Sequence, residues 1–200
     1  MRYLAGLDIG QKRDYTALAI LAYDELESAP RYTASYLHRF PLGTSYADVI
    51  AGVRDVVSTS PLRGDLRLVA DATGVGAPIL EALRRAALDP IGVKIHGGHS
   101  VSRDDDDGSY RVPKRDLVSV VTMLLEGERL KIPARLPQAA VVINELETFR
   151  AKITLDGHDT YESWREKDHD DLVLAIACAA TLIPARRATQ VDSMVSLRCE

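Results

Sequence analysis

The chain has few cysteines, no long apolar run and no excess of positive charge. Its two cysteines, Cys178 and Cys199, are too few for a disulfide framework or a structural zinc site. Its apolar stretches fall well short of the roughly 20 residues that a membrane-spanning helix needs, and Met1 leads directly into a strand-like segment instead of a signal peptide. These absences argue against a disulfide-rich secreted protein or a membrane protein, and we expect a cytoplasmic location.

The formal net charge is −4, from 25 Lys and Arg residues against 29 Asp and Glu residues. Proteins that bind DNA through a basic face usually have a positive net charge. A nuclease that binds the phosphate through metal ions does not need one, so the charge neither supports nor excludes a nucleic-acid substrate. With 200 residues, 46% of them hydrophobic, the chain has the size of one α/β domain.

The hydrophobic pattern predicts a mixed α/β order of elements. Short connections suggest that the first three strands form an antiparallel meander: 3–9, 15–23 and 31–40. A helix and a β-α-β unit with parallel strands follow: 46–58, then 66–71, 77–88 and 91–95.

The second half is predicted to be mainly helical. Helices are expected after Pro113 and after Pro137, and a buried helix over about 170–183. Residues 96–111 are predicted to be a mobile surface loop, and the Asp156-Gly157 pair predicts a β-hairpin over 150–162. We expect one domain over 1–184, with a C-terminal tail at 185–200.

Acidic residues occur at three places where a buried element meets an edge. Asp8 lies in an apolar strand, Asp71 ends the strand LRLVAD, and Asp170 and Asp171 begin the most apolar helix. Buried carboxylates are costly unless cations or hydrogen bonds compensate them, and several together repel one another unless metal ions join them. Hard oxygen ligands of this kind suit Mg²⁺ or Mn²⁺ rather than Zn²⁺.

Each acid also has a purely structural interpretation. Asp170 or Asp171 could cap its helix, where exposed amides and the helix dipole favour a carboxylate. Asp71 could cap the following turn, ATGVG. The three positions together favour a metal site over three unrelated caps.

Four segments together resemble the nuclease domain of phage terminase large subunits, the DNA-packaging motor proteins that cut concatemeric viral genomes: GLDIGQKRDYTALAI, LVADATGVG, VPKRDLV and DHDDLVLAIACA. The resemblance spans about residues 3–183. It implies a ribonuclease H-like fold, with a mixed five-stranded sheet flanked by helices. It also implies a metal-dependent endonuclease of a phage or prophage that cuts double-stranded DNA with little sequence preference.

The resemblance implies a site for two Mg²⁺ or Mn²⁺ ions. Asp8 would match the carboxylate that bridges both ions, Asp71 the second acid and Asp171 the third. Asp170 would be an auxiliary ligand, and Asp14 would match an acid that some terminases place near the metals. The choice between Asp170 and Asp171 as main ligand stays open, with Asp171 favoured. Two ions would clamp the phosphate, activate water and stabilise the leaving oxygen, so no protein nucleophile is needed.

Basic residues near these segments are candidates for contact with the DNA backbone. They are Lys114 and Arg115 after the predicted loop, and Lys12 and Arg13 just past Asp8. His169 could position water or DNA, or it could be an exposed imidazole at a helix start. The four aspartates at 104–107 would repel DNA or simply be solvated.

Three other functions compete with this interpretation. A Holliday-junction resolvase of the same fold would have nearly the same chemistry. Actin-like ATPases and sugar kinases have turns like LDIG and DATGVG, but they need two such domains, for which the chain is too short. A non-catalytic relic would not be expected to keep all the acids. GVGAP at 74–78 lacks the lysine of a phosphate loop, so this chain alone is not expected to hydrolyse ATP, and an ATPase domain or other terminase or portal components would be its partners.

Overall fold

A computed structural model describes residues 1–10, 14–24, 30–74, 76–155 and 170–181. Its centre is one mixed eight-stranded sheet with the order β6-β7-β5-β4-β1-β2-β3-β8. The antiparallel meander consists of β1 (Arg2–Asp8), β2 (Ala17–Tyr23) and β3 (Tyr32–Arg39). Three strands continue the sheet parallel to β1: β4 (Leu66–Asp71), β5 (Pro90–His96) and β7 (Tyr110–Pro113). Short strands β6 (Ser102–Arg103) and β8 (Leu130–Lys131) form the two edges.

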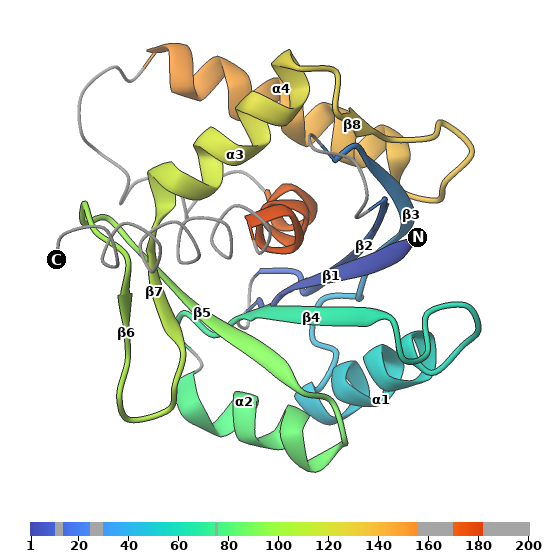
Figure 1. The fold of residues 1–200 in the computed structure, drawn as a ribbon, viewed down its shortest axis with the longest axis vertical. Helices are drawn as coiled ribbons and strands as arrows, with labels where there is room; N and C mark the ends of the chain where they lie inside the picture. The colour runs from blue at the N-terminus through green and yellow to red at the C-terminus, as the bar shows by residue number, and fades with distance from the viewer. Residues whose placement is uncertain (11–13, 25–29, 75, 156–169, 182–200) are drawn as a thin grey trace, which may run out of the picture.

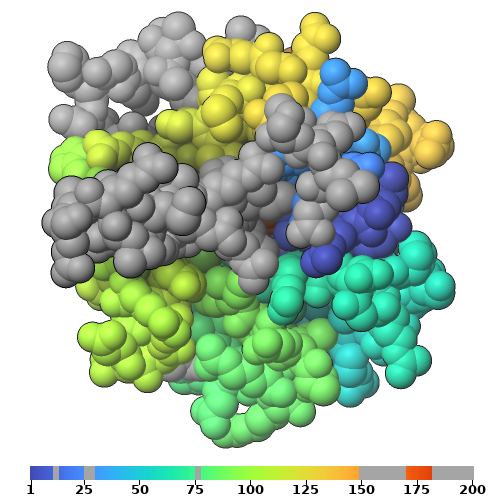
Figure 2. Space-filling model, in the orientation of Figure 1, coloured from blue at the N-terminus to red at the C-terminus, as the bar shows by residue number. Residues whose placement is uncertain are grey.

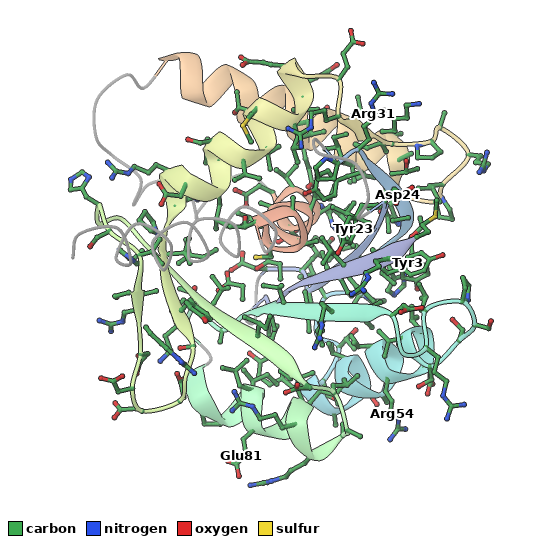
Figure 3. All side chains as sticks on the ribbon, in the orientation of Figure 1. Tyr3, Tyr23, Asp24, Arg31, Arg54 and Glu81 are labelled. Carbon is green, nitrogen blue, oxygen red and sulfur yellow. The ribbon has the colours of Figure 1, made fainter. Side chains whose placement is uncertain are left out.

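Helices cover both faces of the sheet (Figure 1). On one face lie α1 (Tyr46–Val57) and α2 (Gly76–Arg85), whose charged residues Arg54 and Glu81 point outward (Figure 3). On the other face lie α3 (Lys114–Glu126), α4 (Ala139–Leu155) and an unlabelled helix over 171–181, here called the central helix. The space-filling view shows α1 and α2 on one side of the molecule and α3 on the opposite side (Figure 2). No helix among the described residues is long and apolar enough to cross a membrane.

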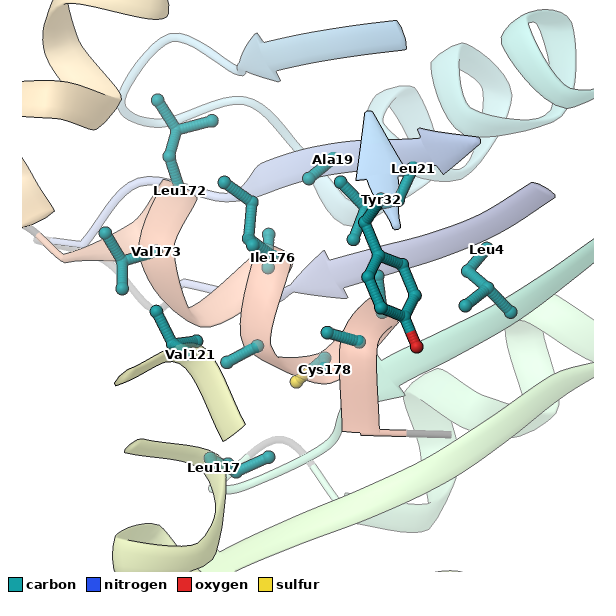
Figure 4. Close-up of a cluster of buried hydrophobic side chains, with 14 of the residues drawn as sticks. Leu4, Ala19, Leu21, Tyr32, Leu117, Val121, Leu172, Val173, Ile176 and Cys178 are labelled. Carbon is teal, nitrogen blue, oxygen red and sulfur yellow. The ribbon is translucent and has the colours of Figure 1, made fainter. Parts of the chain in front are cut away.

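The central helix lies between the sheet and α3 (Figure 1), and buried apolar side chains surround it (Figure 4). Leu172, Val173, Ile176 and Cys178 are fully buried. Their neighbours come from β1, β2, β3 and α3: Leu4, Ala19, Leu21, Tyr32, Leu117 and Val121. The predicted buried helix is therefore confirmed for the residues that the structure describes. An apolar helix of this kind is stable only with other elements packed around it.

Gly6 sets how closely this helix approaches β1. A Cβ atom on Gly6 would stand 1.8 Å from the backbone oxygen of Ala175 and 2.8 Å from the backbone nitrogen of Ala179. Only glycine allows this contact, because any side chain would overlap the helix backbone. Ala175 and Ala179 are one turn apart, so the helix face that presses on β1 contains positions 171, 175 and 179. Asp171 begins this face.

The pattern-based predictions of the first five long strands and of four helices agree with the structure within a few residues, apart from the extent of the helix after Pro137. The sheet has eight strands, not five, because the three short strands β6, β7 and β8 extend it. The predicted mobile loop over 96–111 is wrong in part: β6 and β7 form an antiparallel hairpin there. Strands of two to four residues are too short to give a periodic hydrophobic signal.

The predicted hairpin over 150–162 is wrong in its first half, because residues 150–155 continue α4. An Asp-Gly pair is typical of helix C-termini as well as of hairpin turns, so it did not distinguish the two. Residues 156–162 lie outside the described residues, as do 182–200 and therefore the predicted tail.

The run of aspartates at 104–107 is bound to the sheet. The Lys94 ammonium lies 2.8 Å from Asp104 Oδ2 and 2.9 Å from Asp107 Oδ2. Ser109 donates to Asp107 Oδ1 from its backbone nitrogen and from its hydroxyl. The pKa of Asp107 is lowered to about 2, mainly by the hydrogen bond from the Ser109 hydroxyl and then by Lys94 and the Ser109 backbone N–H. Lys94 therefore forms ion pairs with two of the four aspartates and offsets one of their negative charges, so the loop is less repulsive to DNA than its sequence suggests.

Candidate active site

Asp8 and Asp71 lie side by side at the ends of two parallel neighbouring strands. They are register partners in the β1–β4 pair, and only 8% and 4% of their surfaces are exposed. Side chains that face each other across adjacent strands lie on the same face of the sheet. Here that face is the one covered by the central helix. Gly6, two residues before Asp8, lies against this helix, and Val69, two residues before Asp71, belongs to the hydrophobic core around it. The structure thus brings two predicted site residues together.

The turn after β4 fixes one oxygen of Asp71. The backbone nitrogen of Thr73 donates to Asp71 Oδ1 at 2.7 Å, and the Thr73 hydroxyl donates to the same oxygen. That hydroxyl also accepts a hydrogen bond of 2.7 Å from the backbone nitrogen of Ile95 on β5. Gly74 follows with φ +80°, a left-handed conformation that glycine adopts more easily than other residues. The capping role predicted as an alternative for Asp71 is confirmed for Oδ1.

The central helix begins with the third acid, Asp171, which is 5% exposed. The same helix carries Cys178, whose thiol pKa is raised well above its ordinary value by burial and then by the charges of Asp71 and Asp8. The electrostatic effect of both acids therefore reaches the helix. Because Asp171 lies on the helix face that packs on Gly6, it belongs to the same layer as Asp8 and Asp71.

Arg39 contacts Asp171, and Glu145 contacts both Arg39 and the first turn of the central helix; sequence reasoning missed both residues. Arg39 Nη2 lies 3.4 Å from Asp171 Oδ2 and forms an ion pair with Glu145 Oε1. Glu145 Oε2 accepts hydrogen bonds of 3.1 Å from the backbone nitrogens of Leu172 and Val173. A signal for Glu145 was present, because it lies in the apolar face of the helix that follows Pro137, between buried Val142 and Leu146.

Burial has the largest effect on the pKa of the Glu145 carboxyl group. Burial raises its pKa to about 7, against the lowering effects of Arg39 and of the Val173 backbone N–H. The nearby carboxylates of Asp171 and Asp170 raise it further. Arg39 is therefore a cation shared by closely spaced acids rather than the partner of only one.

A row of register partners explains how Arg39 reaches this place. Asp71 pairs with Asp8, Asp8 with Ala17, and Ala17 with Arg39. Arg39 therefore lies two strands from Asp8, roughly 10 Å away at the usual strand spacing. It lies on the same face of the sheet, where the small side chain of Ala17 separates it from the acids. Its guanidinium lies 4.7 Å from the centre of the Tyr15 ring.

The other predicted site residues have different surroundings. Asp170 Oδ2 lies 4.0 Å from Lys114 Nζ, and the Lys114 side chain is only 11% exposed. Arg115 is partly exposed and donates to the backbone oxygen of His99 at 2.7 Å. Asp14 is exposed, unlike the three buried acids. Lys12, Arg13 and His169 lie outside the described residues.

The donor atoms have the chemistry that a hard divalent cation prefers, since three buried aspartates supply carboxylate oxygens. Among the described residues, however, no group of three or more His, Cys, Asp or Glu side chains is arranged so that it could hold a metal ion. Asp8 and Asp71 are adjacent, while the Asp171 carboxylate points to Arg39. The residues fit a divalent cation in type and burial, and Asp171 would have to turn from Arg39 to join them.

No protein-family model and no curated protein sequence matches the chain. Among solved structures, the nuclease domain of the human cytomegalovirus terminase, soaked with Mn, is similar with a TM-score of 0.56 and 13% identity, over 90% of this chain and 84% of that one. The Mn-bound nuclease domain of the large terminase of bacteriophage SPP1 is 18% identical (TM-score 0.47; 90% and 85% covered). Thermus thermophilus RuvC is 10% identical (TM-score 0.46; 90% and 91% covered).

The chain therefore has the ribonuclease H-like fold, with one mixed sheet between two helical layers. Its described residues superpose on the fold of a terminase nuclease domain, which confirms the predicted resemblance at the level of the fold. At 13% identity the likeness concerns the fold, so the assignment of individual site residues rests on the geometry described above.

Proposed function

We propose that this chain is a metal-dependent endonuclease that cuts double-stranded DNA with little sequence preference, like the cutting domain of a DNA-packaging terminase. The observation that carries the proposal is the register pair of buried carboxylates, Asp8 and Asp71, beneath the helix that begins with Asp171. Burial of several carboxylates at one place is costly in a protein without a cation to join them. The similarity to a nuclease domain soaked with Mn supports a divalent metal.

In this proposal Asp8, Asp71 and Asp171 hold two Mg²⁺ or Mn²⁺ ions, with Asp170 as an auxiliary ligand. Ions held there would supply activation of water for attack and charge stabilisation at the phosphate and the leaving oxygen. The protein's own residues orient the ligands. Thr73 fixes the orientation of the Asp71 carboxylate through Oδ1, and in this proposal Oδ2 would bind the metal. The central helix shields the carboxylates from bulk water, which strengthens their binding to a cation.

The DNA backbone would approach near Lys114 and Arg115, which begin α3 beside the acidic end of the central helix. Contacts of this kind hold a phosphate without reading the bases, which agrees with weak sequence preference. Lys12, Arg13 and His169 remain candidates for further DNA contacts, and Asp14 remains a candidate for an outer metal ligand. The motor function of a terminase would require an ATPase partner.

The test is a plasmid-cleavage assay with Mg²⁺, Mn²⁺ or EDTA. The variants Asp8→Asn, Asp71→Asn and Asp171→Asn keep the side-chain volume and remove the charge. We expect each to lower the rate by a factor of about 100 or more, the range found when a group that stabilises charge in the transition state is lost. Asp170→Asn should have a smaller effect, and Asp55→Asn on the exposed face of α1 is the matched control.

Two outcomes would count against the proposal. Cleavage that persists in EDTA would exclude a metal-dependent reaction, and full activity of Asp8→Asn would exclude the site as assigned. A four-way DNA junction in the same assay separates the two nuclease types. A strong preference for the junction over linear duplex would indicate a resolvase rather than a packaging nuclease.

A further inference from the structure

The amides at the start of the central helix are capped by a residue from another helix. The first N–H groups of a helix have no partner within it, and the side chain at the N-cap position usually accepts from the second or third of them. Here Asp170 is at the N-cap position, since its backbone oxygen accepts from the backbone nitrogen of Leu174. The nitrogens of Leu172 and Val173 instead donate to Glu145 Oε2 of α4, 27 and 28 residues earlier in the chain.

Capping by Glu145 spares the two aspartates a role that would otherwise fall to them. The Asp170 carboxylate extends toward Lys114, and the Asp171 carboxylate extends toward Arg39. A carboxylate oxygen that accepts from the amides of its own helix has fewer lone pairs left for another partner. Because Glu145 caps these amides, both carboxylates can extend away from them.

Arg39 ties the same glutamate to the sheet. Its Nη2 contacts Glu145 Oε1 and lies 3.4 Å from Asp171 Oδ2, and the side chains of Arg39, Glu145 and Asp171 are 15%, 4% and 7% exposed. One guanidinium thus joins β3, α4 and the central helix at the end of the row that contains Asp8 and Asp71. Arginine suits this place because its planar group can serve two carboxylates at once.

We propose that Glu145, with Arg39, is the positioning residue of the acidic site: it fixes the first turn of the central helix and takes up the charge of Arg39, so that Asp171 can turn to the metal. The inference rests on the proposed function. Glu145 itself is not a ligand, because its two oxygens are bound to Arg39 and to the helix amides. It acts on the site through Asp171.

Two variants separate the two contributions of Glu145. Glu145→Gln keeps an oxygen that accepts from the amides but no longer balances Arg39, which would then hold Asp171 more strongly. Glu145→Ala loses both functions. Glu147→Gln, on the exposed side of the same helix, is the matched control.

The first measurement is amide hydrogen exchange of Leu172 and Val173 in metal-free protein. We expect exchange to be about tenfold faster in Glu145→Ala, a factor that corresponds to the usual loss of a helix cap, and unchanged in Glu145→Gln and Glu147→Gln. Unchanged exchange in Glu145→Ala would overturn the capping role. This measurement does not depend on the metal, so it also tests the inference when the proposed function fails.

The second measurement is Mn²⁺ affinity by calorimetry at pH 8. We expect affinity to fall about tenfold in Glu145→Gln although its amides stay protected, and to recover in the double variant Glu145→Gln/Arg39→Gln, which removes both charges. A merely structural cap would not give this recovery. Wild-type affinity in Glu145→Gln would overturn the positioning role while the proposed function stands, whereas no Mn²⁺ binding by the wild type would overturn the proposed function.

Discussion

Replacing Gly6 with alanine tests how closely the central helix must approach β1. The new Cβ would stand 1.8 Å from the backbone oxygen of Ala175. An ordinary contact of a carbon with an oxygen is about 3.3 Å or more, so the helix would have to move by roughly 1.5 Å. Overpacking of a well-filled core costs about 1–3 kcal/mol, and a rigid helix backbone places this site at the upper end. For a chain of this length, about 3 kcal/mol corresponds to a decrease in Tm of roughly 6–12 °C.

The same displacement would move Asp171, which lies on the helix face that contacts Gly6. We therefore expect Gly6→Ala to reduce both the Tm, measured by circular dichroism, and the additional stabilisation by Mn²⁺. Gly97→Ala is the control, because a Cβ there would meet no atom within 4 Å. A Tm of Gly6→Ala within 1 °C of the wild type would refute the close approach and, with it, this account of how Asp171 is held.

Three further predictions follow from buried or paired charges. Asp8→Asn should raise the Tm of the metal-free protein by a few degrees, because it removes one of two adjacent buried charges, and it should abolish the rise in Tm on adding Mn²⁺. Because the folded pKa of Glu145 is raised to about 7, its contribution to stability is present below about pH 4.5 and is lost as the pH rises through 7. The free energy of unfolding in urea should therefore fall by up to about 3 kcal/mol over this pH range. Glu145→Gln should not show this decrease. The lowered pKa of Asp107 gives the opposite sign, with stability present above about pH 4 and lost as the pH falls through about 2, and Asp107→Asn should remove about 1 kcal/mol at neutral pH.

Periodicity predicted the elements because each long strand or helix must bury a face. β1 and β2 are buried on both sides, so they are continuous apolar segments, and an aspartate within such a segment is conspicuous. That contrast made Asp8 and Asp71 visible in the sequence. Their adjacency is a property of strand order, because β4 lies between β5 and β1 in the sheet and does not pair with β3, the strand that precedes it in the chain. No local pattern contains that information.

Arg39 and Glu145 were missed because their roles exist only in the folded protein. Arg39 ends an alternating strand, where a charged residue is unremarkable, and its function comes from the register row that places it two strands from Asp8. Lys94 is a similar case on the other face of the sheet, where it forms ion pairs with Asp104 and Asp107. The sequence contains all these charges, but tertiary contacts decide which of them are paired.

Capping and metal binding do not exclude each other for an aspartate, because its two oxygens can have different partners. Asp71 Oδ1 caps its turn, and Oδ2 is the ligand atom in the proposed site. At the central helix the amides of Leu172 and Val173 are capped by Glu145 of α4. Asp170 is the more exposed of the two and faces Lys114, whereas Asp171 begins the helix face that presses on Gly6, two residues before Asp8. This geometry, which the sequence alone did not provide, favours Asp171 as the third ligand.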